Sequence, residues 1–364
     1  MRIAQVAPLY EAVPPQAYGG TERVVAALCN GLVARGHDVT LFASGGSSTD
    51  AKLEPVVPRP IRLGATPEEM VHIAPHHHLR MLSEVYRREE EFDVIHAHTG
   101  AWALPFTDLA RTPTLHTLHG RLDYAVDRKV LPLYRHAPLV SISNSQRRPV
   151  AHLPLRWAGT AYNGLELDSY SIERGSGDYL AYIGRITPEK RPDWAVEVAE
   201  RAGLPLRVAA KVDPLDVEYW ETEIRPLFEA SDVEFIGEIT EAEKPEFYAG
   251  AAALVFPIDW PEPFGLVMVE SLAAGTPVIA LNRGSVPEVI EHGRSGFVCN
   301  DVDEMVAAIG RLDTLDPETC RRCARRFSHI AMVDSYLTIY HELVEQQSHQ
   351  RWVLPPAMVS GVGS

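Results

Sequence analysis

The amino-acid sequence predicts an α/β protein with two doubly wound parallel-sheet domains that face a central cleft. Three observations support this prediction. The chain has 364 residues, more than one domain core usually holds and enough for two. Short apolar or β-branched runs alternate with longer amphipathic stretches, which is the pattern of βαβ units in a parallel sheet. This alternation pauses once, near Asn163, and then starts again.

The first series of elements occupies residues 1–165. It contains predicted strands at 2–7, 38–43, 93–98, 114–119 and 138–143, with a helix at 22–34. Several of these strands end in His, Ser, Gly or Asn. In open α/β sheets the ligand binds at the carboxyl ends of the strands, so we expect a site at this edge.

The second series occupies residues 178–332, after a polar, glycine-containing linker at 169–178. Its predicted strands are 179–184, 206–210, 233–237, 252–257 and 277–280. Residues 317–347 have helical patterning. A carboxyl-terminal helix at about 333–364 could pack back on the first domain, although the tail from Trp352 lacks helical periodicity.

Composition and charge restrict the class of protein. Hydrophobic residues make up 46% and charged residues 23%, as in ordinary globular domains. The net charge of -15 argues against nucleic acid as a partner, because phosphate backbones recruit clustered Lys and Arg. No apolar run approaches the roughly 20 residues of a membrane helix, and the first residues do not form a signal peptide. We therefore expect a cytoplasmic protein without an integral membrane segment, while peripheral membrane contact stays open.

Three short patterns in the sequence resemble metal-binding or redox motifs, but we interpret each as an ordinary part of the fold. The four cysteines are too few for a disulfide framework, and Cys320 and Cys323 are predicted to lie on a solvated helix face. Asp301 and Asp303 precede an amphipathic run and are predicted to cap a helix. Residues 76–78, three histidines, are predicted to lie at the surface of a loop-rich region, 55–82, that would face an acceptor. No metal site is expected.

Gly19 and Gly20 stand between the first predicted strand and the first helix. Paired glycines allow backbone N–H groups to approach an anion at a helix amino terminus, so a diphosphate could bind here. The segment is neither a Gly-x-Gly-x-x-Gly fingerprint nor a P-loop. A simple turn is the alternative.

Arg185 and Lys190 follow the strand that opens the second series. Two cations five residues apart at the end of a strand can converge on one pyrophosphate, Arg185 as a planar fork and Lys190 as a point charge. They could replace a metal ion. A solvated loop is the alternative.

The most informative segment runs from Pro261 to Val278. It follows a buried strand and contains a predicted helix at 265–274 that ends at Gly275. Glu262 falls in the loop, and Glu270 falls on the helix. Such a segment presents one carboxylate to sugar hydroxyls, a helix amino terminus to phosphate, and a second carboxylate to a ribose diol.

This segment resembles the Glu-x7-Glu signature of glycosyltransferase family 4, whose fold is GT-B, two Rossmann-like domains around a cleft. The likeness covers almost the whole chain. Its motifs occur in the expected order: Gly19-Gly20, His119-Gly120, Asn163-Gly164, Gly184-Arg185 with Lys190, Glu262 to Glu270, and Glu291 to Phe297.

The resemblance implies a role for each candidate residue. Arg185 and Lys190 would hold the nucleotide diphosphate leaving group, and Glu262 would bind hydroxyls of the donor sugar. Glu270 would bind the ribose, and His119 would lie beside the donor sugar. The turn at 237–240, with Ile239, would face the nucleobase. The remaining substrate-binding candidates are Gly19, Gly20, Phe264, Gly265 and Leu266.

The predicted function is therefore retaining transfer of a hexose from a nucleotide diphosphate sugar, with UDP-glucose a plausible donor, to an unidentified acceptor hydroxyl. The resemblance implies that neither a metal nor another cofactor is needed. Two alternatives are a nucleotide-sugar 2-epimerase type of isomerase and a non-catalytic nucleotide-sugar-binding protein. His96 and His98, two residues apart and hence on one face of a strand, could support the site or serve only in packing.

Overall fold

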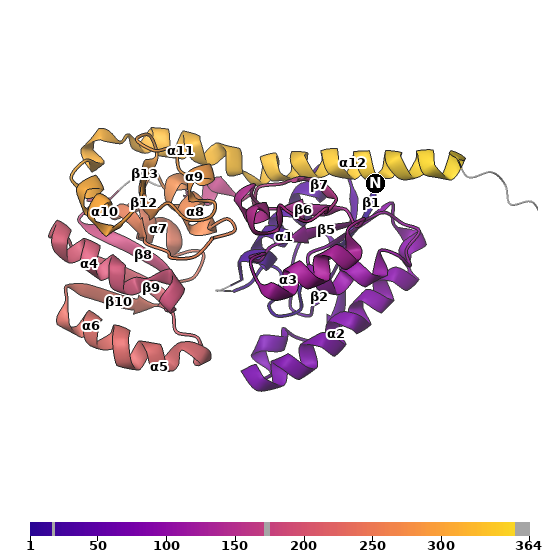
Figure 1. Ribbon diagram of the computed structural model, residues 1–364, viewed down its shortest axis with the longest axis horizontal. Helices are drawn as coiled ribbons and strands as arrows, with labels where there is room; N and C mark the ends of the chain where they lie inside the picture. The colour runs from indigo at the N-terminus through magenta and orange to yellow at the C-terminus, as the bar shows by residue number, and fades with distance from the viewer. Residues whose placement is uncertain (17–18, 171–174, 354–364) are drawn as a thin grey trace, which may run out of the picture.

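Two parallel β-sheets form the centres of two domains in the computed structural model, which describes residues 1–16, 19–170 and 175–353 (Figure 1). The first sheet has seven strands in the order β3-β2-β1-β4-β5-β6-β7. Its strands are β1 (Arg2–Val6), β2 (Asp38–Ser44), β3 (Lys52–Val57), β4 (Val94–Ala97), β5 (Thr114–Leu118), β6 (Leu139–Ser141) and β7 (Trp157–Thr160). The helices around it are α1 (Gly20–Ala34), α2 (Pro67–Arg87) and α3 (Ala125–Val130).

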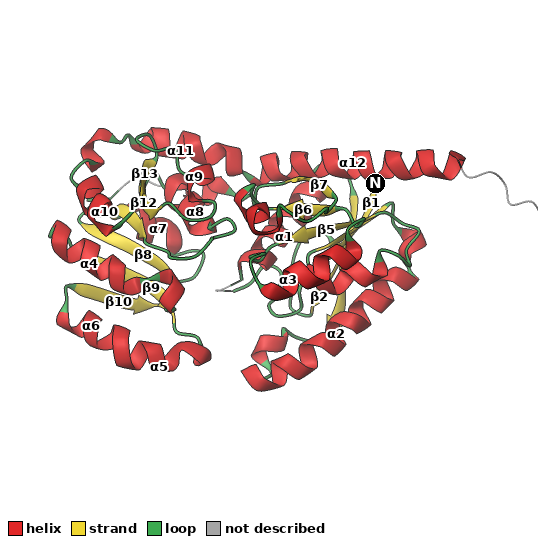
Figure 2. Cartoon of the chain, viewed as in Figure 1, coloured by secondary structure: helices red, strands yellow, loops and turns green. Residues whose placement is uncertain are grey.

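The second sheet has six strands in the order β10-β9-β8-β11-β12-β13. They are β8 (Tyr179–Arg185), β9 (Leu206–Lys211), β10 (Val233–Gly237), β11 (Ala251–Phe256), β12 (Val278–Leu281) and β13 (Gly296–Cys299). Its helices are α4 (Pro192–Ala202), α5 (Val217–Tyr219), α6 (Arg225–Ala230), α7 (Lys244–Ala249), α8 (Leu266–Ala273), α9 (Val286–Val289), α10 (Val302–Ile309) and α11 (Pro317–Ala324). Helices cover the faces of both sheets, as Figure 2 shows, so the predicted fold class is confirmed.

Three strands of the structure, β3, β7 and β13, were not predicted from the sequence. All three lie at the edge of a sheet. β3 and β7 are only partly buried, so their apolar patterns are weak, whereas β13 is largely buried but too short to give a clear pattern. β3 even contains Pro55, and β7 and β13 have four residues each. The central strands, which are buried on both faces, were predicted correctly.

The expectation of a loop-rich region at 55–82 is wrong, because α2 occupies much of it. Thr66 and Glu69 form a reciprocal capping box at its start, which satisfies two backbone N–H groups. His78 is buried on this helix, where Nε2 accepts a hydrogen bond from the Leu9 backbone N–H and Nδ1 donates to the Ala74 carbonyl. His78 is therefore a packed core histidine, whereas His76 is exposed and His77 half-buried, as predicted for this segment.

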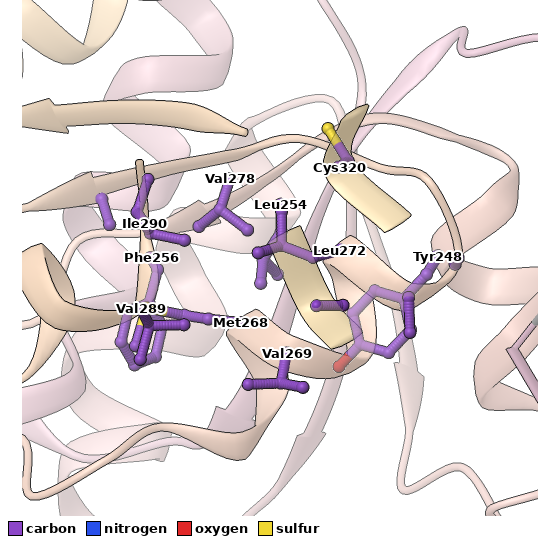
Figure 3. Packing of buried hydrophobic residues seen from close by; sticks show 14 of the residues in the cluster. Tyr248, Leu254, Phe256, Met268, Val269, Leu272, Val278, Val289, Ile290 and Cys320 are labelled. Atoms are coloured by element: carbon purple, nitrogen blue, oxygen red, sulfur yellow. The ribbon is translucent and has the colours of Figure 1, made fainter. Parts of the chain in front are cut away.

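Cys320 and Cys323 on α11 do not lie on a solvated face, as was predicted. Both are buried, and Figure 3 shows Cys320 beside the apolar cluster under α8. The arginines that flank them misled the interpretation, because the helix is amphipathic and its apolar face includes the two cysteines. Asp301, in contrast, accepts a hydrogen bond from the Glu304 backbone N–H and caps α10, as predicted.

The last helix, α12 (His329–Val353), returns from the second domain and crosses the first (Figure 1). Met332, Tyr336 and Tyr340 are buried in the same apolar cluster as α1 and β1. The approach to α1 is close, because a Cβ atom on Gly31 would lie 2.5 Å from a methyl of Val333. Residues 354–364 of the predicted helix and residues 171–174 of the predicted linker lie outside the described residues. No helix in the described part of the chain is long and apolar enough to cross a membrane.

Candidate functional site

Two adjoining cavities lie between the domains, next to the carboxyl ends of β5, β8 and β11. The larger, of about 450 Å³, is here called the main cavity, and the smaller, of about 150 Å³, the side cavity. They share lining residues from both domains, among them Gly20 and Leu266. The predicted site residues that line the main cavity are Gly20, His119, Arg185, Lys190, Glu262, Phe264, Gly265 and Leu266. Those that line the side cavity are Gly19, Gly20, Ile239, Leu266 and Glu270.

The loop between β11 and α8 holds Glu262 at the main cavity. Gly265 precedes α8 with φ of 76°, a conformation that favours glycine, and Gly284 packs against the loop so closely that a Cβ atom would lie 2.3 Å from the Glu262 backbone nitrogen. Ser285, fully buried, donates hydrogen bonds to the carbonyls of Glu262 and Phe264. These contacts fix the backbone of the loop at Glu262.

Lys190 and Glu262 form an ion pair in the main cavity. Lys190 Nζ lies 2.6 Å from Glu262 Oε2, and both side chains are at least 85% buried. The ammonium also lies 4.6 Å from the centre of the Trp260 ring. A lysine has three donors, so Lys190 can keep this pair and still donate to a ligand in the cavity.

Arg185 lies beside Lys190 on the wall of the main cavity and is about 29% exposed. Its guanidinium is 3.8 Å from Glu189. Glu189 also accepts a hydrogen bond from Arg121 of the first domain, at 3.3 Å. Arg121 stacks on Tyr124 and on Trp260, so this group of side chains connects the two domains across the mouth of the cavity.

Glu270 is fully buried at the side cavity, and both of its carboxylate oxygens are hydrogen-bonded. Oε1 accepts from Arg23 at 3.1 Å and from Lys244 at 2.9 Å, while Oε2 accepts from Tyr248 at 2.8 Å. Burial opposes ionisation, but the charges of Lys244 and Arg23 outweigh it and lower the pKa of Glu270. Because Arg23 belongs to α1, this ion pair also joins the two domains.

His119 follows β5 and lines the main cavity. Its Nε2 lies 2.8 Å from His98 Nδ1, whereas its buried Nδ1 has no hydrogen-bond partner among the described residues. Burial lowers the pKa of His119 to about 4, so the imidazole is neutral at physiological pH. A neutral imidazole has one donor nitrogen and one acceptor nitrogen.

Phe264 lines the main cavity, but its ring packs into the protein core. Its ring is buried against Phe327, with ring centres 5.5 Å apart, and against Tyr162. Figure 3 shows the cluster that continues under α8, with Phe256, Met268 and Leu272. The Phe264 ring therefore holds the loop on the core of the second domain.

Comparison with known proteins agrees with this geometry. Residues 18–165 match the family described as Glycosyltransferase Family 4, and residues 171–327 match Glycosyl transferases group 1. The chain belongs to glycosyltransferase family 4. It is 28% identical over 374 residues to a glycogen synthase of Mycobacterium tuberculosis, with 89% of each chain covered.

Solved structures have the same fold as this glycosyltransferase. One is AviGT4, a glycosyltransferase involved in avilamycin A biosynthesis, with a TM-score of 0.68, 24% identity and coverage of 95% of this chain and 98% of that one. Another is Anabaena HepE in complex with UDP-glucose, with a TM-score of 0.69, 19% identity and coverage of 96% and 100%. The predicted enzyme class and the GT-B fold are both confirmed.

Several site residues of this glycosyltransferase were missed by sequence reasoning. Arg23 and Lys244 reach Glu270 from 247 and 26 positions away, and Arg121 and Trp260 meet across the cleft. Long-range pairs of this kind leave no periodic signal in a single sequence. Three of them lie close to a recognised motif: Arg121 directly follows His119-Gly120, Arg23 lies three residues after Gly20, and Trp260 lies two residues before Glu262.

Buried histidines should make the stability of the enzyme depend on pH. His96, His98 and His116 are buried and His119 is half-buried. Burial lowers the pKa of all four, that of His116 to about 3. In the unfolded chain their pKa is about 6.5, so stability is complete above that pH and is lost as pH falls toward 4. Each histidine would contribute up to about 1.4 kcal/mol per pH unit in this window.

The measurement is the urea midpoint of unfolding at pH 7.5 and pH 5.5, and it should fall clearly at the lower pH. Glu22, whose pKa is raised to about 7 by burial, acts in the opposite direction, as do Glu11, Asp127 and Asp216, whose pKa values burial also raises. The histidines dominate between pH 5.5 and pH 7.5, because their pKa in the unfolded chain is about 6.5, whereas that of a carboxyl group is about 4. In the variant His116→Gln the pH dependence should be smaller by about one proton. A midpoint that stays level or rises on acidification would contradict the assignment.

Proposed function

We propose that this glycosyltransferase moves a hexose from a UDP-sugar, with UDP-glucose the first candidate, to an acceptor hydroxyl with retention of anomeric configuration and without a divalent metal. The observation that supports the proposal is the set of residues that line the main cavity. Arg185, Lys190 and the amino terminus of α8 provide positive charge, and Glu262 provides a hydroxyl acceptor on the same wall.

The donor would occupy both cavities. Its diphosphate would lie between Arg185, Lys190 and the first backbone N–H groups of α8, and its sugar would lie between Glu262 and His119. The ribose would reach Glu270 in the side cavity, and the base would lie beside Ile239. The solved HepE complex with UDP-glucose has the same fold, which supports UDP as the nucleotide.

The chemistry follows from this placement. The bond between the anomeric carbon and the diphosphate oxygen breaks, and its electron pair leaves with UDP. The acceptor oxygen forms the new bond on the same face of the sugar, and its proton passes to the leaving phosphate oxygen. Arg185 and Lys190 stabilise the negative charge that develops on the diphosphate, a role that a metal ion has in other enzymes. One such contact is worth roughly 3 kcal/mol.

The test is a mass-spectrometric screen of UDP-, GDP- and ADP-sugars for donor hydrolysis by the whole enzyme in EDTA. We expect release of UDP from UDP-glucose or a close relative, at an unchanged rate when magnesium is added. Activity that disappears in EDTA and returns with magnesium would contradict the metal-free part of the proposal. Turnover confined to GDP- or ADP-sugars would contradict the choice of UDP.

A further inference from the structure

A continuous chain of buried hydrogen bonds connects His119 in the main cavity to α12, which packs on one face of the first sheet. Its members come from β1, β4, β5, the residues that follow β4 and β5, and α12. They are His119, His98, Gln5, Tyr340, His96, Thr117 and Tyr336, here called the buried chain. Except for His119, each is at least 97% buried.

The distances along the buried chain are those of strong hydrogen bonds. His98 Nε2 lies 2.8 Å from Gln5 Oε1, and Gln5 Nε2 lies 2.9 Å from the Tyr340 hydroxyl. The Tyr340 hydroxyl lies 2.6 Å from His96 Nδ1, and His96 Nε2 lies 2.7 Å from Thr117 Oγ1. Thr117 lies 3.0 Å from the Tyr336 hydroxyl, where the buried chain ends.

The Gln5 amide sets the direction of the proton in each hydrogen bond of the buried chain from His119 to Thr117. Its oxygen faces His98 and can only accept, so His98 carries its proton on Nε2. His98 Nδ1 is then an acceptor, because burial keeps the imidazole neutral, and it must receive the proton of His119 Nε2. In the other direction, the Gln5 amide donates to Tyr340, whose hydroxyl proton goes to His96.

We propose that the buried chain holds His119 in the tautomer with its proton on Nε2, so that Nδ1 accepts a hydrogen bond from a hydroxyl of the donor sugar. The proposal rests on the proposed function for the identity of the ligand. It explains why the buried Nδ1 atom of His119, a residue that lines the main cavity, has no partner among the described residues. Such an atom is costly unless a ligand completes its hydrogen bonding.

Gln5, His98 and Tyr340 are therefore positioning residues, which act on the donor through His119. Tyr340 has a particular part, because its hydroxyl is the acceptor that fixes the Gln5 nitrogen. In Tyr340→Phe the amide loses this partner and can rotate, which turns its N–H toward His98. The protons of His98 and His119 then shift, and His119 Nδ1 becomes a donor in part of the molecules.

The first test reads the tautomer directly, by long-range proton–nitrogen NMR of the histidine-labelled full chain, with the His119 signal assigned by its loss in His119→Gln. We expect an unprotonated Nδ1 in the wild type and a mixture of tautomers in Tyr340→Phe and in Gln5→Met. The control is Tyr86→Phe, which removes a hydroxyl that donates to Thr114 in the same domain but outside the buried chain. A protonated Nδ1 in the wild type, or spectra of His119 unchanged in both variants, would overturn the proposal.

The second test separates positioning from general stability. UDP does not carry the sugar that would meet His119, so Tyr340→Phe should bind UDP as the wild type does and bind UDP-glucose about fivefold to tenfold more weakly relative to UDP. Equal loss for both ligands would indicate a merely structural role and would count against the proposal. If the wild type bound neither ligand, the proposed donor would be wrong, and the histidine spectra alone would decide whether the buried chain sets the tautomer.

Discussion

Replacing Lys190 with alanine is expected to lower the turnover of the sugar donor by about a hundredfold. The lost ammonium would no longer stabilise the charge that develops on the leaving diphosphate, and single contacts of this type are worth about that factor. The variant also leaves Glu262 without its ion-pair partner, next to the anionic donor. Both effects lower kcat, and the rate of UDP release from the donor measures it.

The control for this variant is Lys52→Ala. Lys52 lies on the edge strand β3, is 65% exposed and pairs only weakly at the surface with Glu54, so its loss should leave turnover unchanged. A kcat for Lys190→Ala within twofold of the wild type would remove Lys190 from the proposed site. Equal losses in both lysine variants would indicate a general effect of net charge.

Replacing Glu270 with glutamine is expected to lower both stability and nucleotide affinity. The carboxylate is fully buried, and its loss removes one of the two carboxylates that contact Arg23 and Lys244 near the side cavity. Breaking a buried ion pair by removing one partner costs about 3–5 kcal/mol, here toward the lower value because Glu241 also contacts both cations. The midpoint of thermal unfolding should fall by roughly 5 °C or more.

Addition of UDP separates the two effects of this change. A ligand that binds the folded state raises the midpoint of thermal unfolding, so UDP should stabilise the wild type clearly and Glu270→Gln much less. The matched control is Glu246→Gln, an exposed position on α7 in the same domain, which should keep both the midpoint and the response to UDP. A Glu270→Gln variant that matched the wild type in both respects would refute a ribose-binding role.

The grouping of the site residues could be predicted because most of them follow a strand or lie at the start of a helix. Arg185 ends β8, His119 follows β5 and Glu262 follows β11, and parallel strands bring these ends to one edge of their sheets. All of the predicted site residues accordingly line one of the two cavities. Their individual roles in binding and catalysis remain predictions.

The partners of those residues could not be predicted, because they depend on how the two domains meet. Arg23 reaches Glu270 only when α1 approaches α8, and no local pattern encodes that approach. The buried chain has the same origin, since Tyr340 meets Gln5 only after α12 returns to the first domain. The sequence analysis left packing and support of the site open for His96 and His98, and the structure places both in the buried chain.

The helix α2, in the region predicted to be loop-rich, does have a recognisable start signal in the sequence. The start of α2 carries Thr66, Pro67 and Glu69, a capping box with proline in the first helical turn. Pro75 and the run of histidines argued against a helix, because a proline within a helical pattern usually marks the end of the helix. Edge strands such as β3 gave no comparable signal, since their exposure weakens the apolar alternation.

The most direct test of the central claim is proton NMR of the sugar first released when the enzyme hydrolyses UDP-glucose in EDTA. The glucose of this donor is α-linked, and the proposed mechanism delivers the attacking oxygen to the same face. The account predicts that α-glucose appears first and that the β-anomer follows only through slow mutarotation in solution. Initial release of β-glucose would contradict the proposed mechanism.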